Sequence, residues 1–138
     1  MFFIAGITGN IGGAAAEMLL AEGKQVRAVV RDLGKANAWV EKGVELRVGD
    51  LTDPDVPAAA PEGVEAAFLM QPTPIGVTRE FAEAKALINA IVEALDRMPP
   101  PRAVALSSVG SEQDRGLGNI TQTHKLERKR PGFGTRGR

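Results

Sequence analysis

The sequence predicts an α/β fold in which helices cover both faces of a doubly wound parallel sheet. Short apolar runs alternate along the chain with segments of helical periodicity, the pattern of successive β–α–β units. A glycine-rich turn separates the first apolar run from the first helical segment. The 138 residues, 43% of them hydrophobic, suffice for one domain with its own core.

Five short segments predict the strands of this sheet, and the first, at residues 2–5, is apolar throughout, as expected of a strand buried on both faces. They cover residues 2–5, 26–30, 44–48, 65–70 and 103–106. The connection 51–63 contains three prolines, so any helix there is short or irregular.

Helical spacing predicts the intervening helices. In the first, the apolar residues that recur at this spacing are Ile11, Ala15, Met18 and Leu19, and Gly23 stands where a C-terminal cap belongs. A second helix is expected from about residue 34 to 42. A long third helix spans about 81–95, before a run of prolines, and a weak one spans about 119–129.

Composition excludes several classes of function. Seventeen basic and seventeen acidic residues give zero net charge, which disfavours a nucleic-acid partner. The chain has no cysteine and a single histidine, His124, so we expect no disulfide, iron–sulfur cluster or multi-histidine metal site. No apolar run reaches membrane length and no signal peptide is evident, so we expect a cytoplasmic protein without a membrane partner.

The strongest motif is the turn G-I-T-G-N-I-G at residues 6–12. Gly6 permits a tight turn after the strand, Gly9 lets a pyrophosphate approach the backbone, and Gly12 allows close helix–strand packing. The following helix offers free N–H groups and its positive dipole end, and Thr8 and Asn10 can add side-chain hydrogen bonds. A Rossmann-type dinucleotide site is therefore predicted. A purely structural turn remains the alternative, because a glycine triplet alone is a weak signal.

The end of the second strand usually determines which dinucleotide binds. A carboxylate there favours NAD, and an arginine accommodates the 2′-phosphate of NADP. This chain has Arg31 followed by Asp32, with Lys35 one helical turn further on. The planar donor fork of arginine suits a phosphate, so the sequence favours NADP over NAD. A solvated basic pair at a helix start is the alternative.

Two later strand ends add candidates. Asp50 follows the third strand, where its carboxylate either accepts a hydrogen bond from the adenine amino group or only starts a turn. Gln71 and Pro72 follow the fourth strand, beside the expected position of the nicotinamide ribose.

This ordered set of motifs resembles the NmrA-like atypical short-chain dehydrogenase/reductases over roughly residues 1–127. The resemblance rests on residues 6–12, 26–32, 43–45, 49–51, 68–72 and 106–110. The group includes NAD(P)H-dependent quinone and triphenylmethane-dye reductases, and also NmrA, a redox-sensing regulator. The resemblance implies that the cofactor-binding residues are Gly6, Thr8, Gly9, Asn10, Ile11, Gly12, Arg31, Asp50, Leu51, Gln71, Pro72 and Ser107.

The resemblance also implies a function. We expect an NAD(P)H-dependent oxidoreductase that passes hydride from NADPH to a quinone-like or other small conjugated acceptor. A non-catalytic dinucleotide sensor that controls a protein partner is the alternative, as is an inactive truncated fragment. The chain has no tyrosine, which excludes the Tyr-x-x-x-Lys acid–base pair of typical short-chain reductases, and leaves the catalytic residues unknown.

The C-terminal segment departs from the family pattern. Residues 125–138 hold six basic residues and one acid, a net charge of +5, so residues 1–124 carry −5. Family members continue past the fifth strand into further strands and a substrate-binding portion. We therefore expect an NAD(P)-binding domain over residues 1–127, incomplete at its C-terminal side, and a disordered or non-native basic tail over residues 128–138. A patch for nucleic acid or membrane is the third and least favoured interpretation of the tail, because five charges attract such partners only weakly.

Overall fold

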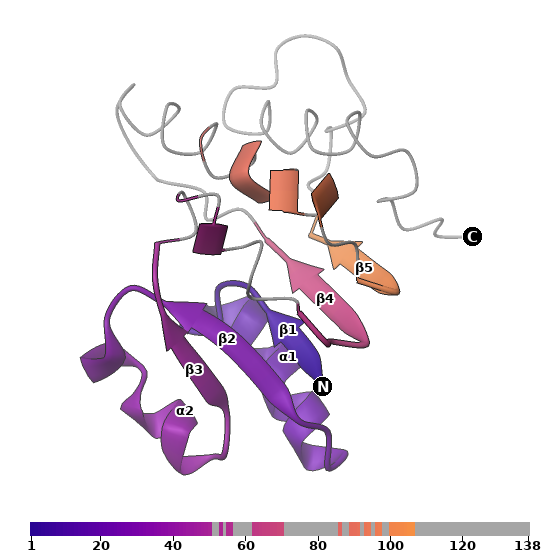
Figure 1. The fold of residues 1–138 in the computed structure, drawn as a ribbon. Coiled ribbons are helices and arrows are strands. Elements are labelled where there is room, and N and C mark those ends of the chain that lie inside the picture. The colour runs from indigo at the N-terminus through magenta and orange to yellow at the C-terminus, as the bar shows by residue number, and fades with distance from the viewer. Residues whose placement is uncertain are drawn as a thin grey trace, which may run out of the picture.

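A computed structural model describes residues 1–50, 53, 55–56, 62–70, 86, 89–91, 93–94, 96–97 and 100–106. Five parallel strands form one sheet in the order β3-β2-β1-β4-β5 (Figure 1). The strands are β1 (Phe2–Ile4), β2 (Val26–Val30), β3 (Glu45–Val48), β4 (Ala66–Leu69) and β5 (Arg102–Ala105). Each predicted strand is confirmed within one residue at either end. The strand order reverses beside β1, which confirms the predicted doubly wound topology.

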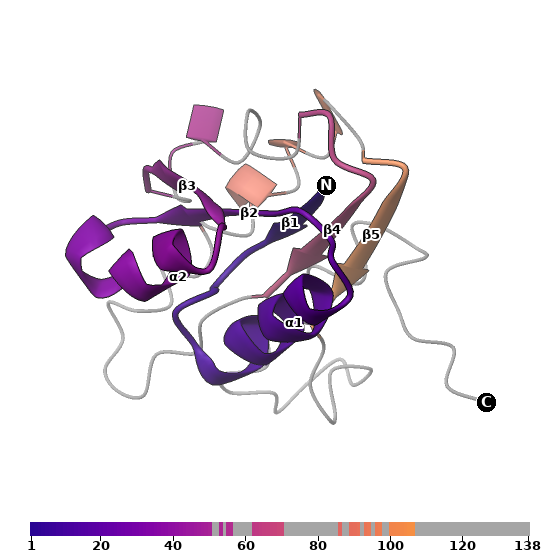
Figure 2. The ribbon, with the colours of Figure 1, turned by 90° about the horizontal axis from the view of Figure 1, so that it is seen from below.

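Alternate residues of the strands form two hydrophobic clusters, one on each face of the sheet. One cluster joins strand residues such as Phe3 and Val29 to Ile91 of the segment between β4 and β5. The other joins residues such as Ile4 and Val26 to Ala16. It lies under α1 (Asn10–Ala21) and α2 (Asn37–Glu41), which share one side of the sheet in Figure 2. This two-sided burial explains why the central strands β1 and β2 are mostly apolar at successive positions. The edge strand β3 contains Glu45 and Arg47 and is only partly buried.

The helix α1 buries a different set of residues from those whose spacing predicts it. Ile11 is 51% exposed and Met18 is 70% exposed. The buried residues of α1 are Gly12, Gly13 and Ala16. The helix lies so close to the end of β1 that only small residues fit between them. Its predicted end is confirmed, since Gly23 adopts φ 71° directly after the helix.

The single helix predicted over residues 34–42 is wrong in its first half. The structure has a short 3-10 helix, η1 (Leu33–Lys35), and then the separate helix α2. The Asp32 side chain accepts a hydrogen bond from the Gly34 N–H at 2.9 Å, which starts a tight turn. Ala36, at φ −119° and ψ 3°, then separates the two helices.

Between β4 and β5, the described residues from 86 to 97 are helical, in agreement with the predicted long helix. In the connection before β4, Asp55 and Val56 lie in a helical turn. The Arg97 guanidinium joins the two segments, because it pairs with Asp55 at 3.1 Å and also with Glu93. In the part of the chain that the structure describes, no helix is long and apolar enough to cross a membrane. The weak helix expected at 119–129 and the tail at 128–138 lie outside the described residues.

Candidate functional site

The glycine-rich turn lies at the C-terminal end of β1 and leads directly into α1. Gly6 has φ 72°, a conformation that glycine adopts without steric cost. The Gly9 N–H donates to the Gly6 carbonyl oxygen at 2.9 Å, and the Gly13 N–H donates to the Gly9 oxygen at 2.9 Å. The first bond closes the turn and the second begins the helix.

The space around each glycine matches the role that the sequence predicts for it. A Cβ atom on Gly12 would lie 2.3 Å from the Gly6 oxygen, so the helix packs against the turn without a side chain between them. A Cβ atom on Gly6 would lie 2.7 Å from the Met70 Sδ. Among the described residues, a Cβ atom on Gly9 would meet only the Gly6 oxygen, at 3.3 Å. No other described residue therefore approaches the outer surface of the turn at Gly9.

The N-terminus of α1 carries no side-chain cap within the described part of the chain. Gly9 is the N-cap and supplies no side chain, and among the described residues no side chain caps the helix. The first turn contains no acidic residue, and Thr8, Gly9, Asn10 and Ile11 are exposed. The first N–H groups of this 12-residue helix and its positive dipole end therefore face outward. This combination suits a phosphate.

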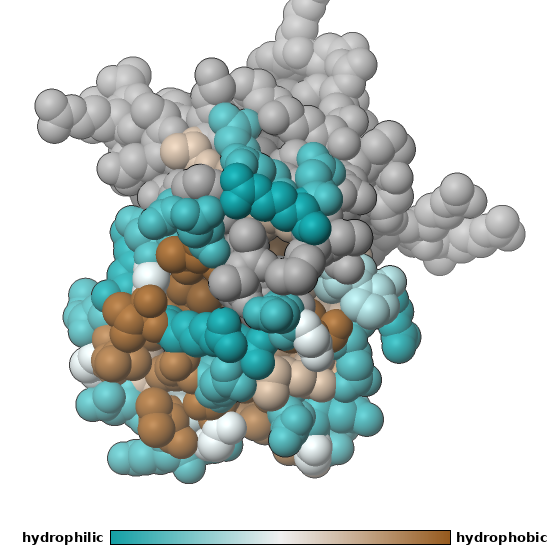
Figure 3. All heavy atoms as spheres, in the orientation of Figure 1, coloured by the Kyte–Doolittle hydropathy of each residue, from teal (hydrophilic) through white to brown (hydrophobic). Residues whose placement is uncertain are grey.

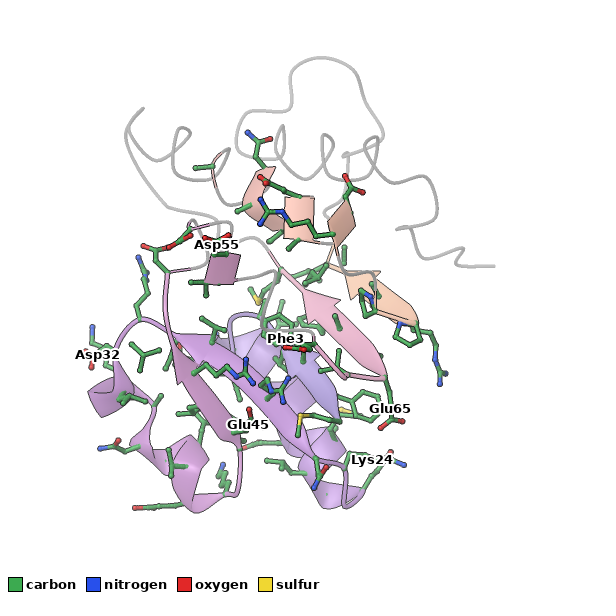
Figure 4. The ribbon with its side chains drawn as sticks, viewed as in Figure 1. Phe3, Lys24, Asp32, Glu45, Asp55 and Glu65 are labelled. Atoms are coloured by element: carbon green, nitrogen blue, oxygen red, sulfur yellow. The ribbon has the colours of Figure 1, made fainter. Side chains whose placement is uncertain are left out.

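Arg31 and Asp32 follow β2 and differ in whether their side chains already form hydrogen bonds within the described part of the chain. Asp32 lies beyond the end of β2, and one of its oxygens holds the Gly34 N–H (Figure 4). The exposed Arg31 side chain has no hydrogen bond or ion pair within the described part of the chain. Lys35, also exposed, ends η1. The free cation is therefore the better placed of the two neighbours to receive an incoming anion.

The third strand end is shaped by a contact between Gly49 and Val56. The Gly49 N–H donates to the Val30 oxygen at 3.0 Å, and a Cβ atom on Gly49 would lie 2.7 Å from the Val56 Cγ1. Asp50 is exposed, and its carbonyl oxygen accepts a hydrogen bond from Asp53 N–H at 3.0 Å. Asp50 therefore does start a turn, while its contact with adenine stays a prediction.

Hydrophobic side chains are exposed beside this edge of the site. Figure 3 shows them gathered over the region of η1, α2 and β3. The exposed large hydrophobic residues of these elements are Leu33, Val40 and Val48. Leu33 and Val48 stand close in sequence to Arg31 and Asp50, so this edge offers apolar surface on which a flat ring could pack.

The predicted site residues that the structure describes all follow strands at the same edge of the sheet, as parallel strands require. Leu51, Gln71, Pro72, Ser107 and His124 lie outside the described residues. Met70, which follows β4, packs against the glycine turn that follows β1. The pairing of Ile4 with Phe68 explains this position, because it places the residues that follow β1 and β4 side by side.

The strand order and the glycine turn that leads from β1 into α1 together define a Rossmann-type domain. The chain belongs to the NmrA-like family, whose model matches residues 2–95.

Two curated relatives align with stretches of different length. The NAD(P)H azoreductase of Xenophilus azovorans is 35% identical over 72 residues, which are 52% of this chain and 25% of the relative. A photosystem II assembly factor of Cyanophora paradoxa is 32% identical over 114 residues, which are 80% of this chain and 35% of the relative. The chain thus spans about a quarter to a third of the length of these relatives.

Solved structures show the same fold. The triphenylmethane reductase of Citrobacter sp., complexed with NADP(H), superposes with a TM-score of 0.73 at 23% identity, over 93% of this chain and 45% of that one. An NADPH-dependent quinone oxidoreductase of Escherichia coli, complexed with NADPH, gives a TM-score of 0.74 at 24% identity, over 91% of this chain and 44% of that one. The domain described here therefore corresponds to less than half of each enzyme.

Proposed function

We propose that this chain binds NADP(H) at the glycine turn and is the cofactor-binding part of an NAD(P)H-dependent oxidoreductase. The proposed reaction passes hydride from NADPH to a quinone-like or other small conjugated acceptor. The observation that carries the proposal is the N-terminus of α1, which no side chain of the described residues caps, behind a turn that no other described residue approaches at Gly9. The azoreductase name of one relative supports the reaction class.

The residues present fit a dinucleotide. The N–H groups of Asn10, Ile11 and Gly12 are placed to donate to a pyrophosphate, and the exposed Thr8 can add its hydroxyl. When bound, the nicotinamide supplies a hydride for transfer. From the family resemblance, the rest of the proposed site consists of Asp50 and Leu51 at adenine, Gln71 and Pro72 at the nicotinamide ribose, and Ser107 at the nicotinamide.

NADP is proposed over NAD because of what Arg31 and Asp32 do. One oxygen of Asp32 accepts the Gly34 N–H, which gives this carboxylate a role in the local turn. The exposed Arg31 guanidinium can form charge-assisted hydrogen bonds to a 2′-phosphate. Lys35 adds a second positive charge on the same short segment.

The chain's own contribution to the reaction is binding and orientation. It has no tyrosine, so no Tyr-x-x-x-Lys pair can deliver a proton. Quinones and dyes can take their proton from water once hydride has arrived, so positioning of donor and acceptor is sufficient. We propose the cytoplasm as the compartment and a small molecule as the acceptor.

Titration calorimetry with NADPH and NADH tests the binding step, and Gly9→Ala provides a sharp variant. Gly9 has φ −92°, which alanine adopts freely, and within the described part of the chain an added Cβ atom would meet only the Gly6 oxygen. The variant should therefore fold like the wild type and bind NADPH at least about tenfold more weakly, since the methyl group stands at the helix end. Unchanged binding by a folded Gly9→Ala variant would place the ligand elsewhere.

Oxidation of NADPH, followed by nicotinamide absorbance with quinone, azo and triphenylmethane acceptors, tests the reaction in a full-length relative that carries this domain. A second candidate function is a dinucleotide-binding module without turnover, because the assembly factor aligns with more of this chain than the azoreductase does. Binding of NADPH with no oxidation by any acceptor would favour this module. Absence of binding would overturn both.

A further inference from the structure

We infer that Trp39 is a positioning residue that fixes Arg31 relative to the N-terminus of α1, and so sets the preference for NADPH over NADH. The inference rests on the proposed function and adds a specificity determinant that lies outside the binding site. Trp39 is the only tryptophan of the chain and belongs to α2. Its effect on a ligand must therefore pass through other residues.

The Trp39 side chain contacts α1 at Gly13. A Cβ atom on Gly13 would lie 3.3 Å from the Cζ2 and 3.8 Å from the Cη2 of Trp39. The indole ring therefore lies against the bare backbone of the helix. Gly13 donates its N–H to the Gly9 oxygen, so this contact is on the helical turn that presents the free N–H groups. The ring holds α2 at a fixed distance from the proposed pyrophosphate site.

A short segment of chain, which contains η1, joins Trp39 to Arg31. The backbone N–H of Trp39 donates to the backbone oxygen of Ala36 at 2.8 Å, and the backbone N–H of Ala36 donates to the backbone oxygen of Leu33 at 2.9 Å. Ala36 is completely buried. Asp32 caps the start of η1. This run of hydrogen bonds leaves the segment little freedom, so its placement on the domain depends on the Ala36 and Trp39 contacts.

Lys42 also contacts both Trp39 and α1, through weak interactions at the surface. Its Nζ lies 4.7 Å from the centroid of the Trp39 ring and 2.6 Å from the Glu17 Oε1. Lys42 and Glu17 are 47% and 57% exposed, so this ion pair adds little stability. Lys42→Met removes the charge while keeping an apolar side chain near the ring, and it is the matched control.

A purely structural role for Trp39 makes a different prediction from a positioning role. If the ring only stabilised the domain, its loss would weaken NADPH and NADH binding equally. If it positions Arg31, its loss weakens only the contact with the 2′-phosphate, which NADH lacks. The ratio of the two dissociation constants therefore separates the two roles.

The test is calorimetric titration of NADPH and NADH into the wild type, Trp39→Leu, Arg31→Ala, the double variant and Lys42→Met. We expect Trp39→Leu to reduce the preference for NADPH roughly tenfold, the loss of about one charge-assisted hydrogen bond. In the Arg31→Ala background the same change should alter the ratio much less, because only Lys35 then remains on the segment. Lys42→Met should keep the wild-type ratio.

Each outcome is decisive. An equal loss of both cofactors in Trp39→Leu, or the same change of ratio with and without Arg31, would overturn the inference while leaving the proposed function intact. Failure of the wild type to bind either cofactor would overturn the proposed function and the inference together. If Trp39→Leu does not fold, Trp39→Phe replaces it, and a wild-type ratio in that variant counts against the inference.

Discussion

Gly12 faces the carbonyl oxygen of Gly6 so closely that a Cβ atom on Gly12 would lie 2.3 Å from that oxygen. The same oxygen accepts the Gly9 N–H at 2.9 Å. One carbonyl group thus fixes both the turn after β1 and the approach of α1. The spacing of these glycines serves the packing of the domain as well as the proposed binding of phosphate.

Gly12→Ala should therefore destabilise the domain, although alanine is the better helix former. Helix propensity alone would stabilise the variant by up to about 1 kcal/mol. The clash with the Gly6 backbone forces α1 outward, at a net cost of about 1–3 kcal/mol. Urea unfolding measures the difference. Ala14→Gly, at an exposed position of the same helix, is the control and should cost only about 1 kcal/mol of propensity. A Gly12→Ala variant as stable as the wild type would contradict the close approach.

Arg31→Ala should weaken cofactor binding, whereas Asp32→Ala should lower the stability of the domain. Without the Arg31 guanidinium, NADPH should bind roughly 10- to 100-fold more weakly while NADH is unaffected. Asp32→Ala removes the cap on Gly34 N–H and should cost about 0.5–2 kcal/mol of stability, with the NADPH preference retained. Calorimetric titration measures the first effect and thermal melting the second. If Asp32→Ala instead abolished NADH binding and Arg31→Ala changed nothing, the domain would be specific for NAD.

The sequence predicted the strands better than the helix surfaces, for a physical reason. β1 is apolar at every position and β2 at all positions but Arg27, as burial on both faces requires, so hydrophobicity locates these central strands. The buried face of α1 consists of Gly12, Gly13 and Ala16, while Ile11 and Met18 are exposed. Where two backbones approach closely, small size matters more than hydrophobicity. The glycine spacing contained this signal, but the apolar periodicity did not.

Local hydrogen bonds explain why the helix expected over residues 34–42 is divided into η1 and α2. The helix expected from residue 34 breaks at Ala36 because Asp32 caps Gly34 and starts a 3-10 turn. An Asp two residues before a glycine is a recognisable turn signal. The contacts of Trp39 with Gly13 and of Met70 with Gly6 join residues distant in sequence. Periodicity carries no information about such pairs.

A buried arginine connects β2, β3 and the segment before β4. The Arg27 Nε and Nη2 donate to the two carboxylate oxygens of Glu45, at 2.8 and 3.2 Å, and its Nη1 donates to the Glu62 carbonyl oxygen at 2.7 Å (Figure 4). The hydrogen bond from Arg27 lowers the pKa of Glu45 below its ordinary value, with smaller contributions from the charges of Arg27 and Arg47. Burial acts in the opposite direction.

Glu45→Gln should accordingly lower stability at neutral pH but not in acid. A carboxyl group whose pKa is lowered by folding stabilises the folded state above its unfolded pKa, close to 4.5. This stabilisation is lost as the pH falls through the folded pKa. The difference between wild type and variant should therefore be present at about pH 7 and shrink below about pH 4.5. Urea unfolding across this range measures it, with the exposed Glu41→Gln as control. A difference independent of pH would show that the charge of Glu45 contributes nothing.

The contact between Met70 and Gly6 predicts non-additive stability. Gly6→Ala places a Cβ atom 2.7 Å from the Met70 Sδ, and it also forces alanine to adopt φ 72°, which costs about 1–2 kcal/mol. Met70→Ala removes the obstructing thioether, so the double variant should retain the cost of the backbone conformation but not that of the clash. Urea unfolding of the wild type, both single variants and the double variant gives the coupling free energy, expected at about 0.5–3 kcal/mol in favour of the double variant. Strict additivity would mean that the two side chains do not meet.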